Sequence, residues 1–152
     1  MFQYRQSGAR YYGVEGEVTA KLLRRGSFEL DGNVVADYVR ATLNNGGGPV
    51  PRIPPLRVLA GLSARSGPIG GRVEVEHVTP QNRIAAFETP TDDFTLVNAS
   101  LSWKPFGTES ETTLILSANN IFDVDARRHA SFTKDFVPLA GRDIRVAARI
   151  SF

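Results

Sequence analysis

The sequence predicts an all-β protein, an antiparallel up-and-down meander of seven or eight strands. Three observations predict it. Apolar and polar residues alternate with period two in segment after segment, helical periodicity is scarce, and short and long connections follow one another along the chain. In a meander every second connection lies at the same end, so we expect one end of the sheet to carry tight turns and the other long loops.

The first two predicted strands cover residues 12–22 and 28–38. In the second strand Phe28, Leu30 and Val34 alternate with Glu29 and Asp31, which gives the strand one apolar face and one acidic face. The first strand alternates in the same way over a similar length. Both are predicted to be two-faced strands of one sheet.

Five further segments complete the meander. A short stub at residues 2–6 precedes the first strand. They cover residues 57–65, 72–79, 96–104, 113–119 and 142–152. In the last of these Ile144 and Val146 lie on one face while Arg145 and Arg149 lie on the other, and two arginines suit water better than a packed core.

The connections sort by length. The short ones are residues 24–26, 67–71 and 105–111, and the long ones are residues 44–55, 80–93 and 123–141. Transmembrane barrels of the bacterial outer membrane sort their connections in this way, with short periplasmic turns and long external loops.

Aromatic residues are predicted to form two girdles on the apolar face. Phe28 and Trp103 lie beside short turns, and Tyr12 and Tyr38 lie beside long loops. Amphipathic rings suit the lipid headgroup region at both edges of an apolar band. We therefore expect the apolar face to meet lipid and the polar face to line an aqueous lumen. The predicted lumen residues are charged: Glu15, Glu17, Lys21, Glu29, Asp31, Asp37, Arg145 and Arg149.

Composition argues against several other classes. The net charge is +2 and basic and aromatic residues do not interleave on one face, so no nucleic-acid partner is predicted. The chain has no cysteine and only two histidines, His77 and His129, so no metal site is predicted. It contains no Gly-x-Ser-x-Gly motif and no P-loop, and we expect neither an enzyme nor a cofactor.

Several short motifs together resemble TonB-dependent outer-membrane receptors. The pattern from Asn119 to Asp123, followed by a long loop and by Gly141-Arg142 before a final strand with an aromatic end, resembles the carboxyl end of that family. Residues 51–55 (PRIPP), residues 88–91 (ETPT) and Gly16-Glu17 also match. The loop around His129 is most similar to members suspected of zinc uptake.

The resemblance implies a roughly 22-stranded transmembrane β-barrel whose lumen holds an amino-terminal plug. Such a barrel imports a scarce ligand, such as a siderophore or a metal. Residues 1–152 would be its carboxyl-terminal segment, without the plug and the earlier strands. The implied location is the outer membrane. The implied partners are outer-membrane lipid, the remaining barrel and plug, the TonB complex and the barrel-assembly machinery, which would recognise Ile150 and Phe152.

The resemblance and the loop composition also nominate site residues. Arg127, Arg128, His129 and Lys134 are candidate ligand contacts in the longest loop. A structural role in ordering that loop is predicted for a second group, because Asn and Asp bond to nearby backbone in turns and Gly permits unusual backbone angles. That group is Asn119, Asn120, Asp123, Gly141 and Arg142.

Two other functions remain open at this point. The chain could be a self-contained eight-stranded outer-membrane barrel with a structural or adhesion role, or a soluble β-barrel or β-sandwich binding protein. The soluble protein would pack Val34, Leu101, Leu116 and Val146 in an interior, whereas either membrane protein would leave them facing outward.

Overall fold

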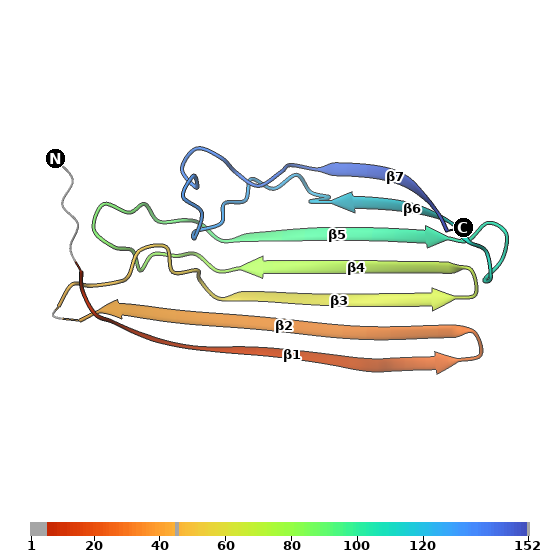
Figure 1. Cartoon of the computed structure of the whole chain (residues 1–152), viewed down its shortest axis with the longest axis horizontal. Coiled ribbons are helices and arrows are strands. Elements are labelled where there is room, and N and C mark those ends of the chain that lie inside the picture. The colour runs from red at the N-terminus through yellow and green to blue at the C-terminus, as the bar shows by residue number, and fades with distance from the viewer. Residues whose placement is uncertain (1–5, 45, 152) are drawn as a thin grey trace.

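The computed structural model describes residues 6–44 and 46–151, which form one antiparallel sheet of seven strands. Each strand pairs with its neighbour in the sequence, in the order β1 to β7 (Figure 1). The strands are β1 Ala9–Arg25, β2 Phe28–Leu43, β3 Arg57–Ser66, β4 Ile69–Val78, β5 Phe94–Trp103, β6 Thr112–Asn119 and β7 Asp143–Ile150. The all-β meander is therefore confirmed. Of the predicted stub at 2–6 only Gln6 is described, and Phe152 lies outside the described residues.

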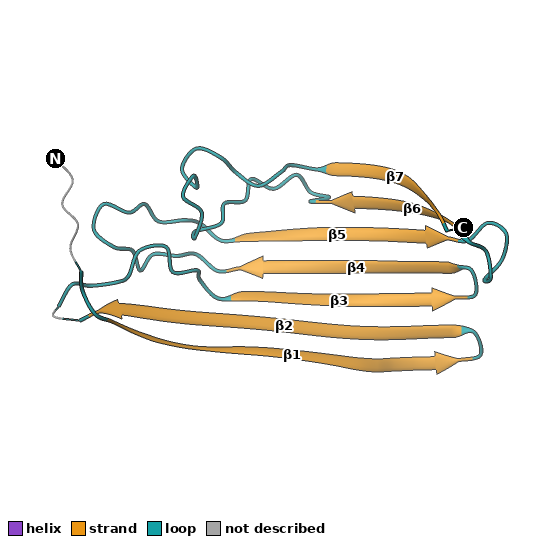
Figure 2. Ribbon diagram, in the orientation of Figure 1, coloured by secondary structure: helices purple, strands orange, loops and turns teal. Residues whose placement is uncertain are grey.

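Short turns and long loops separate to opposite ends, as the sequence predicts (Figure 2). The β1–β2 and β3–β4 hairpins turn through two residues each, Gly26-Ser27 and Gly67-Pro68. In both, the first turn residue is a glycine with positive φ, +57° and +53°. A positive φ at the first position alone is the pattern of a type II′ turn, whose twist matches that of the flanking strands.

Several strand boundaries differ from the predicted ones, most of all in β1, β2 and β4. β1 and β2 are longer than residues 12–22 and 28–38, because Ala9 still pairs with Leu43. β2 stops pairing with β3 at Asp37, so this hairpin projects beyond β3. The turn predicted at 67–71 is shorter, because Gly70 and Gly71 already belong to β4.

One face of the sheet, which we call the outer face, is a continuous apolar surface, because residues that pair across strands share a face. The opposite face is called the inner face. One row runs Leu30, Ala64, Gly71, Leu101, Leu116 and Val146 from β2 to β7. Val34, Leu101, Leu116 and Val146 are 47%, 48%, 45% and 79% exposed. They do not pack in an interior, which argues against the soluble protein.

The inner face is polar over most of its area. Lys21, Asp31, Ser63, Arg72 and Ser100 form one of its rows. Arg72 lies flat on this face, bonded to Glu74, Ser63 and Asn33. Gly61 leaves room for the guanidinium, since a Cβ there would lie 2.7 Å from Arg72 Nη2.

At the loop end the inner face carries apolar residues, and a loop covers them. Val78, Phe94 and Leu96 are buried beneath Ala126, with Val124 and Leu139 packed alongside. This small core holds the loop between β6 and β7 against the wall.

β1 and β7 are the two edges of the sheet, and in the described part of the chain they do not pair with each other. Among residues 6–44 and 46–151, no helix is long and apolar enough to cross a membrane. Open strand edges present unpaired N–H and C=O groups, which hydrocarbon does not tolerate. In a membrane these two edges therefore need further strands as partners.

Candidate functional site at the loop end

Three long loops meet at one end of the sheet. They are the β2–β3 loop (residues 44–56), the β4–β5 loop (residues 79–93) and the β6–β7 loop (residues 120–142), and all lie on the left in Figure 1. The β4–β5 loop also reaches the projecting β1–β2 hairpin, where Arg83 donates to Ala41 O and Thr42 Oγ1. Ala41 is fully buried, and its carbonyl oxygen also accepts from Val50 N of the β2–β3 loop.

A series of ion pairs holds the β6–β7 loop against the inner face of the sheet. Arg128 binds both carboxylate oxygens of Glu76 on β4, at 2.8 and 2.7 Å. Glu76 also pairs with Arg57, which in turn binds Asp37 at 2.7 Å. Bidentate arginine–carboxylate pairs fix orientation as well as distance, so Arg128 sets the position of the loop on β4.

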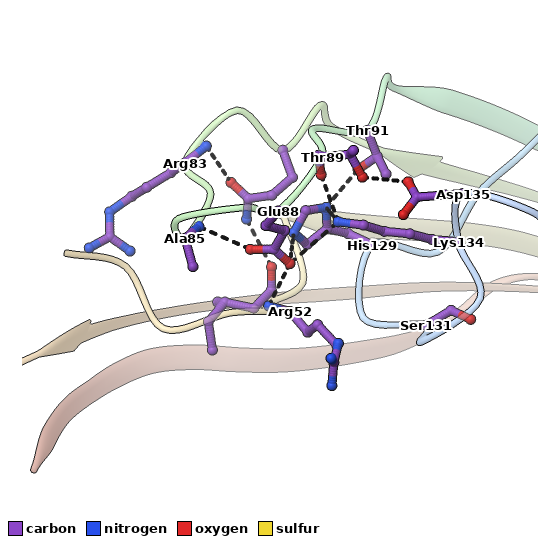
Figure 3. A network of polar contacts seen from close by, with 12 residues as sticks. Arg52, Arg83, Ala85, Glu88, Thr89, Thr91, His129, Ser131, Lys134 and Asp135 are labelled. Carbon is purple, nitrogen blue, oxygen red and sulfur yellow. Dashed lines mark hydrogen bonds and ion pairs between the residues drawn. The ribbon is translucent and has the colours of Figure 1, made fainter. Parts of the chain in front are cut away.

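Glu88 joins all three loops (Figure 3). Its Oε1 accepts from the Arg52 backbone N–H of the β2–β3 loop at 2.8 Å, and its Oε2 accepts from Ala85 N at 3.0 Å. Lys134 of the β6–β7 loop lies 3.3 Å from Oε1 and also donates to Thr89 O at 2.6 Å. A further bond joins Thr89 Oγ1 to Asp135.

His129 is buried inside this network, with 2% of its surface exposed. Its Nδ1 lies 3.0 Å from Thr91 Oγ1 and 3.3 Å from Lys134 Nζ. Its Nε2 lies 3.1 Å from Glu88 Oε1, but the two atoms are not aligned for a hydrogen bond.

The network shifts the titration of both residues. Burial of the Glu88 carboxyl raises its pKa, but the Ala85 and Arg52 N–H groups and the Lys134 ammonium outweigh burial and hold the pKa below its ordinary value of 4.5. Burial, helped by the Lys134 charge, lowers the pKa of His129 below its ordinary value of 6.5 despite the opposing charges of Glu88 and Asp135. At neutral pH Glu88 is therefore ionised and His129 is neutral.

Asn120 and Asp123 lie at the start of the β6–β7 loop with positive φ, 47° and 56°. The Asn120 side chain bonds to Val124 N, Val124 O and Ala140 O. Asp123 Oδ1 accepts from Arg142 N at 2.7 Å, and a Cβ on Gly141 would meet the same oxygen at 2.7 Å. These contacts close the base of the loop, while Asn119 pairs with Asp143 in the sheet.

The four residues nominated as ligand contacts all bind the protein's own groups. Arg127 donates to Lys134 O and approaches Asp125, while Arg128, His129 and Lys134 belong to the networks described above. The structure thus gives each a place in fixing the loop, and contact with a ligand stays a prediction. The residues predicted to form the aromatic girdles lie on the outer face, with Phe28 and Trp103 in one row at the short-turn end. Their role at a lipid boundary stays a prediction.

Two groups of residues at this end were not nominated from the sequence. The first is the Asp37–Arg57–Glu76 set, of which only Asp37 was named, as a charge facing the lumen. Its members lie on separate strands, and their meeting depends on a register that alternation alone does not give. The second is a group of exposed loop phenylalanines, Phe87, Phe132 and Phe136, at 109%, 81% and 86% exposure. The Arg52 guanidinium stacks 3.6 Å over the Phe132 ring.

A pocket of about 280 Å³ lies between the β6–β7 loop and the wall. Its lining includes Asp37, Arg57, Arg128 and His129, with Pro54 and Pro55 from the β2–β3 loop. Within the described residues, no three His, Cys, Asp or Glu side chains are grouped so as to hold a metal ion.

The fold and the two-faced sheet define a segment of barrel wall. A family model described as TonB dependent receptor-like, beta-barrel, matches residues 1–121. The chain therefore belongs to the family of TonB-dependent receptor-like β-barrels. A solved structure described as the copper transporter OprC superposes with a TM-score of 0.73 over 95% of this chain, at 23% identity. The chain spans only 24% of the length of that transporter.

Proposed function

We propose that the chain forms wall strands and external loops of a TonB-dependent importer in the outer membrane, which takes up a siderophore, a metal or a similarly scarce nutrient. The observation that carries this proposal is the division of the sheet into an uninterrupted apolar face and a charged, hydrogen-bonded face. A barrel in a membrane needs the first toward lipid and the second toward its lumen.

The open edges of β1 and β7 support a place within a larger barrel. We propose that residues 1–152 are a carboxyl-terminal barrel segment and that strands of the remaining barrel pair with both edges. A plug would then fill the lumen against the polar face. In this arrangement Ile150, which ends β7, and Phe152 are the residues that the barrel-assembly machinery recognises.

The orientation of the faces can be tested at two adjacent residues of β5. The chain has no cysteine, so Leu101→Cys and Ser100→Cys each introduce a single labelling site on opposite faces. A fluorophore at residue 101 should be quenched by nitroxide groups on lipid acyl chains, and one at residue 100 should not. Equal quenching at both positions would remove the support for a lipid-facing surface.

Import is tested in cells that express the protein under nutrient limitation. Uptake of candidate ligands should require both the protein and a functional TonB complex. Growth and uptake that are unchanged when the gene is deleted, across siderophores and free metals, would leave a wall without transport and favour a structural or adhesion role.

A further inference from the structure

In the Glu88 network the two nitrogen atoms of the buried His129 ring lie beside opposite charges, Nδ1 beside the Lys134 ammonium and Nε2 beside the Glu88 carboxylate. Lys134 Nζ contacts three acceptors, Glu88 Oε1, Thr89 O and His129 Nδ1, which uses all three of its N–H donors. An ammonium can only donate, so this contact assigns Nδ1 as an acceptor and places the proton of the neutral ring on Nε2.

Protonation of His129 therefore has a direct structural consequence. The new proton would sit on Nδ1, which faces the Lys134 ammonium at 3.3 Å and the Thr91 hydroxyl at 3.0 Å. The contact with Lys134 would change from donor–acceptor to cation–cation. Because both side chains are at least 94% buried, water cannot screen this repulsion.

The surrounding charges do not absorb a second cation. Glu88 of the β4–β5 loop is the carboxylate in contact with the ring, and it already neutralises Lys134. Asp135 of the β6–β7 loop also favours a protonated ring, but it is exposed and bonded to Thr89, so water weakens its charge.

The other charged groups nearby are also engaged. Arg128 and Glu76 neutralise each other, and Arg57 and Asp37 form a pair across the adjoining pocket. Arg52 of the β2–β3 loop adds positive charge, with its guanidinium on the Phe132 ring. Among the buried groups, the protonated network would thus hold two cations, Lys134 and His129, against one carboxylate, Glu88.

We propose that His129 is an acid-sensitive latch of the external loops, and that its protonation frees the β6–β7 loop from Glu88 and so separates the three loops. Release would uncover the pocket between that loop and the wall, including Arg57 and Asp37. The inference deepens the proposed function as its regulation, and it rests on that function in placing the loops outside the cell.

The test follows the distance between two loops in the full protein purified in detergent. Spin labels are attached to Ala86→Cys and Thr133→Cys, at exposed positions of the β4–β5 and β6–β7 loops in a chain with no other cysteine. Pulsed electron–electron resonance should give one narrow distance distribution at about pH 7.5 and a longer, broader one at about pH 5. A distribution that stays narrow at both values overturns the proposal.

The two histidines provide matched controls. His77 lies exposed on the outer face of β4, bonded to Thr95 and on the opposite face from Glu76, so His77→Gln should keep the full pH response. His129→Asn places an amide oxygen near the Nδ1 position and cannot be protonated, so it should keep the narrow distribution at both pH values. The reverse result assigns the response to His77 and sinks the latch.

A second measurement covers the case in which His129→Asn fails to fold. In the labelled His77→Gln protein His129 is the remaining histidine of the sequence, so its ring signals in a nuclear magnetic resonance spectrum should titrate together with the change in distance, with a midpoint below 6.5, the ordinary pKa of histidine. Opening while the His129 ring remains neutral would assign the response to carboxylates and overturn the role of His129. The lipid-quenching and uptake experiments test the proposed function separately, because the detergent measurement requires neither a membrane nor a ligand.

Discussion

The two ends of the sheet are ordered by different kinds of contact. At the short-turn end, Gly26-Ser27 and Gly67-Pro68 reverse the chain between strands that are adjacent in sequence. At the loop end, the contacts join Arg52 to Glu88, Glu88 to Lys134 and Glu76 to Arg128, across 36, 46 and 52 positions. Local backbone geometry orders the first end, whereas two buried carboxylates, Glu88 of the β4–β5 loop and Glu76 of β4, order the second.

Removal of Glu88 should have the largest effect on the loop end. Glu88→Ala would leave the Lys134 ammonium buried without its carboxylate and two backbone N–H groups without acceptors. Breaking one partner of a buried ion pair costs about 3–5 kcal/mol, here in local loop stability. Hydrogen-exchange mass spectrometry should show faster exchange in all three loops and unchanged exchange in the β3–β4 hairpin.

Glu29→Ala is the matched control at the short-turn end. Glu29 is a half-exposed carboxylate 3.9 Å from Arg24, a distance at which an exposed pair contributes only about 0–1 kcal/mol. Comparable exchange changes in the two variants would mean that a buried and an exposed carboxylate contribute equally to the order of the two ends.

Acidification should reproduce part of the Glu88 effect in two stages. His129 has a lowered pKa, so the stability that it contributes is complete above 6.5 and is lost as the pH falls from 6.5 toward the pKa of the folded state. Glu88 also has a lowered pKa, so its contribution is complete above 4.5 and is lost as the pH falls further. Loop exchange, corrected for its intrinsic pH dependence, should rise in these two windows, and a single transition below 4.5 would exclude His129.

The contrast between local and long-range contacts explains which features of the fold could be predicted from the sequence. Alternation is a local property, so the seven strands and their faces followed from residues such as Leu101 and Ser100, which need no knowledge of the register. The ends of β1 and β2 were placed too early because alternation weakens near Arg24 and Arg40, although backbone pairing continues to Arg25 and Leu43.

The candidate site was harder to predict for the same physical reason. Asn120 and Asp123 act on groups within their own loop, where Asn and Asp have known backbone preferences, and they were nominated from the sequence. The meeting of Glu76 with Arg128 and of Glu88 with Lys134 depends on how three loops fold over the wall. No pattern in one segment encodes those distances.

A substitution at Gly67 tests the local ordering of the short-turn end. Gly67→Ala places a Cβ on a residue with φ of +53°, which costs an L-residue about 1–2 kcal/mol. Exchange should rise in the β3–β4 hairpin and not in the loops. Gly67→Asn should cost less, because asparagine adopts positive φ more readily; equal effects of the two substitutions would point to a cause other than backbone conformation.

The smallest expected effect lies at Gly141, where local and long-range ordering meet. Its φ is not in the left-handed region among the described residues, so the reason for glycine is space: an added Cβ would lie 2.7 Å from Asp123 Oδ1. Gly141→Ala should push the carboxylate away from Arg142 N and cost about 1 kcal/mol, the value of one hydrogen bond.

Gly71→Ala is the control, since its Cβ would make only an ordinary contact of 3.7 Å. If the clash with Asp123 is the cause, Gly141→Ala should add little in an Asp123→Ala background, where the bond is already lost. Additive effects would instead assign the glycine to the backbone of the loop exit and separate it from the contacts that close the loop.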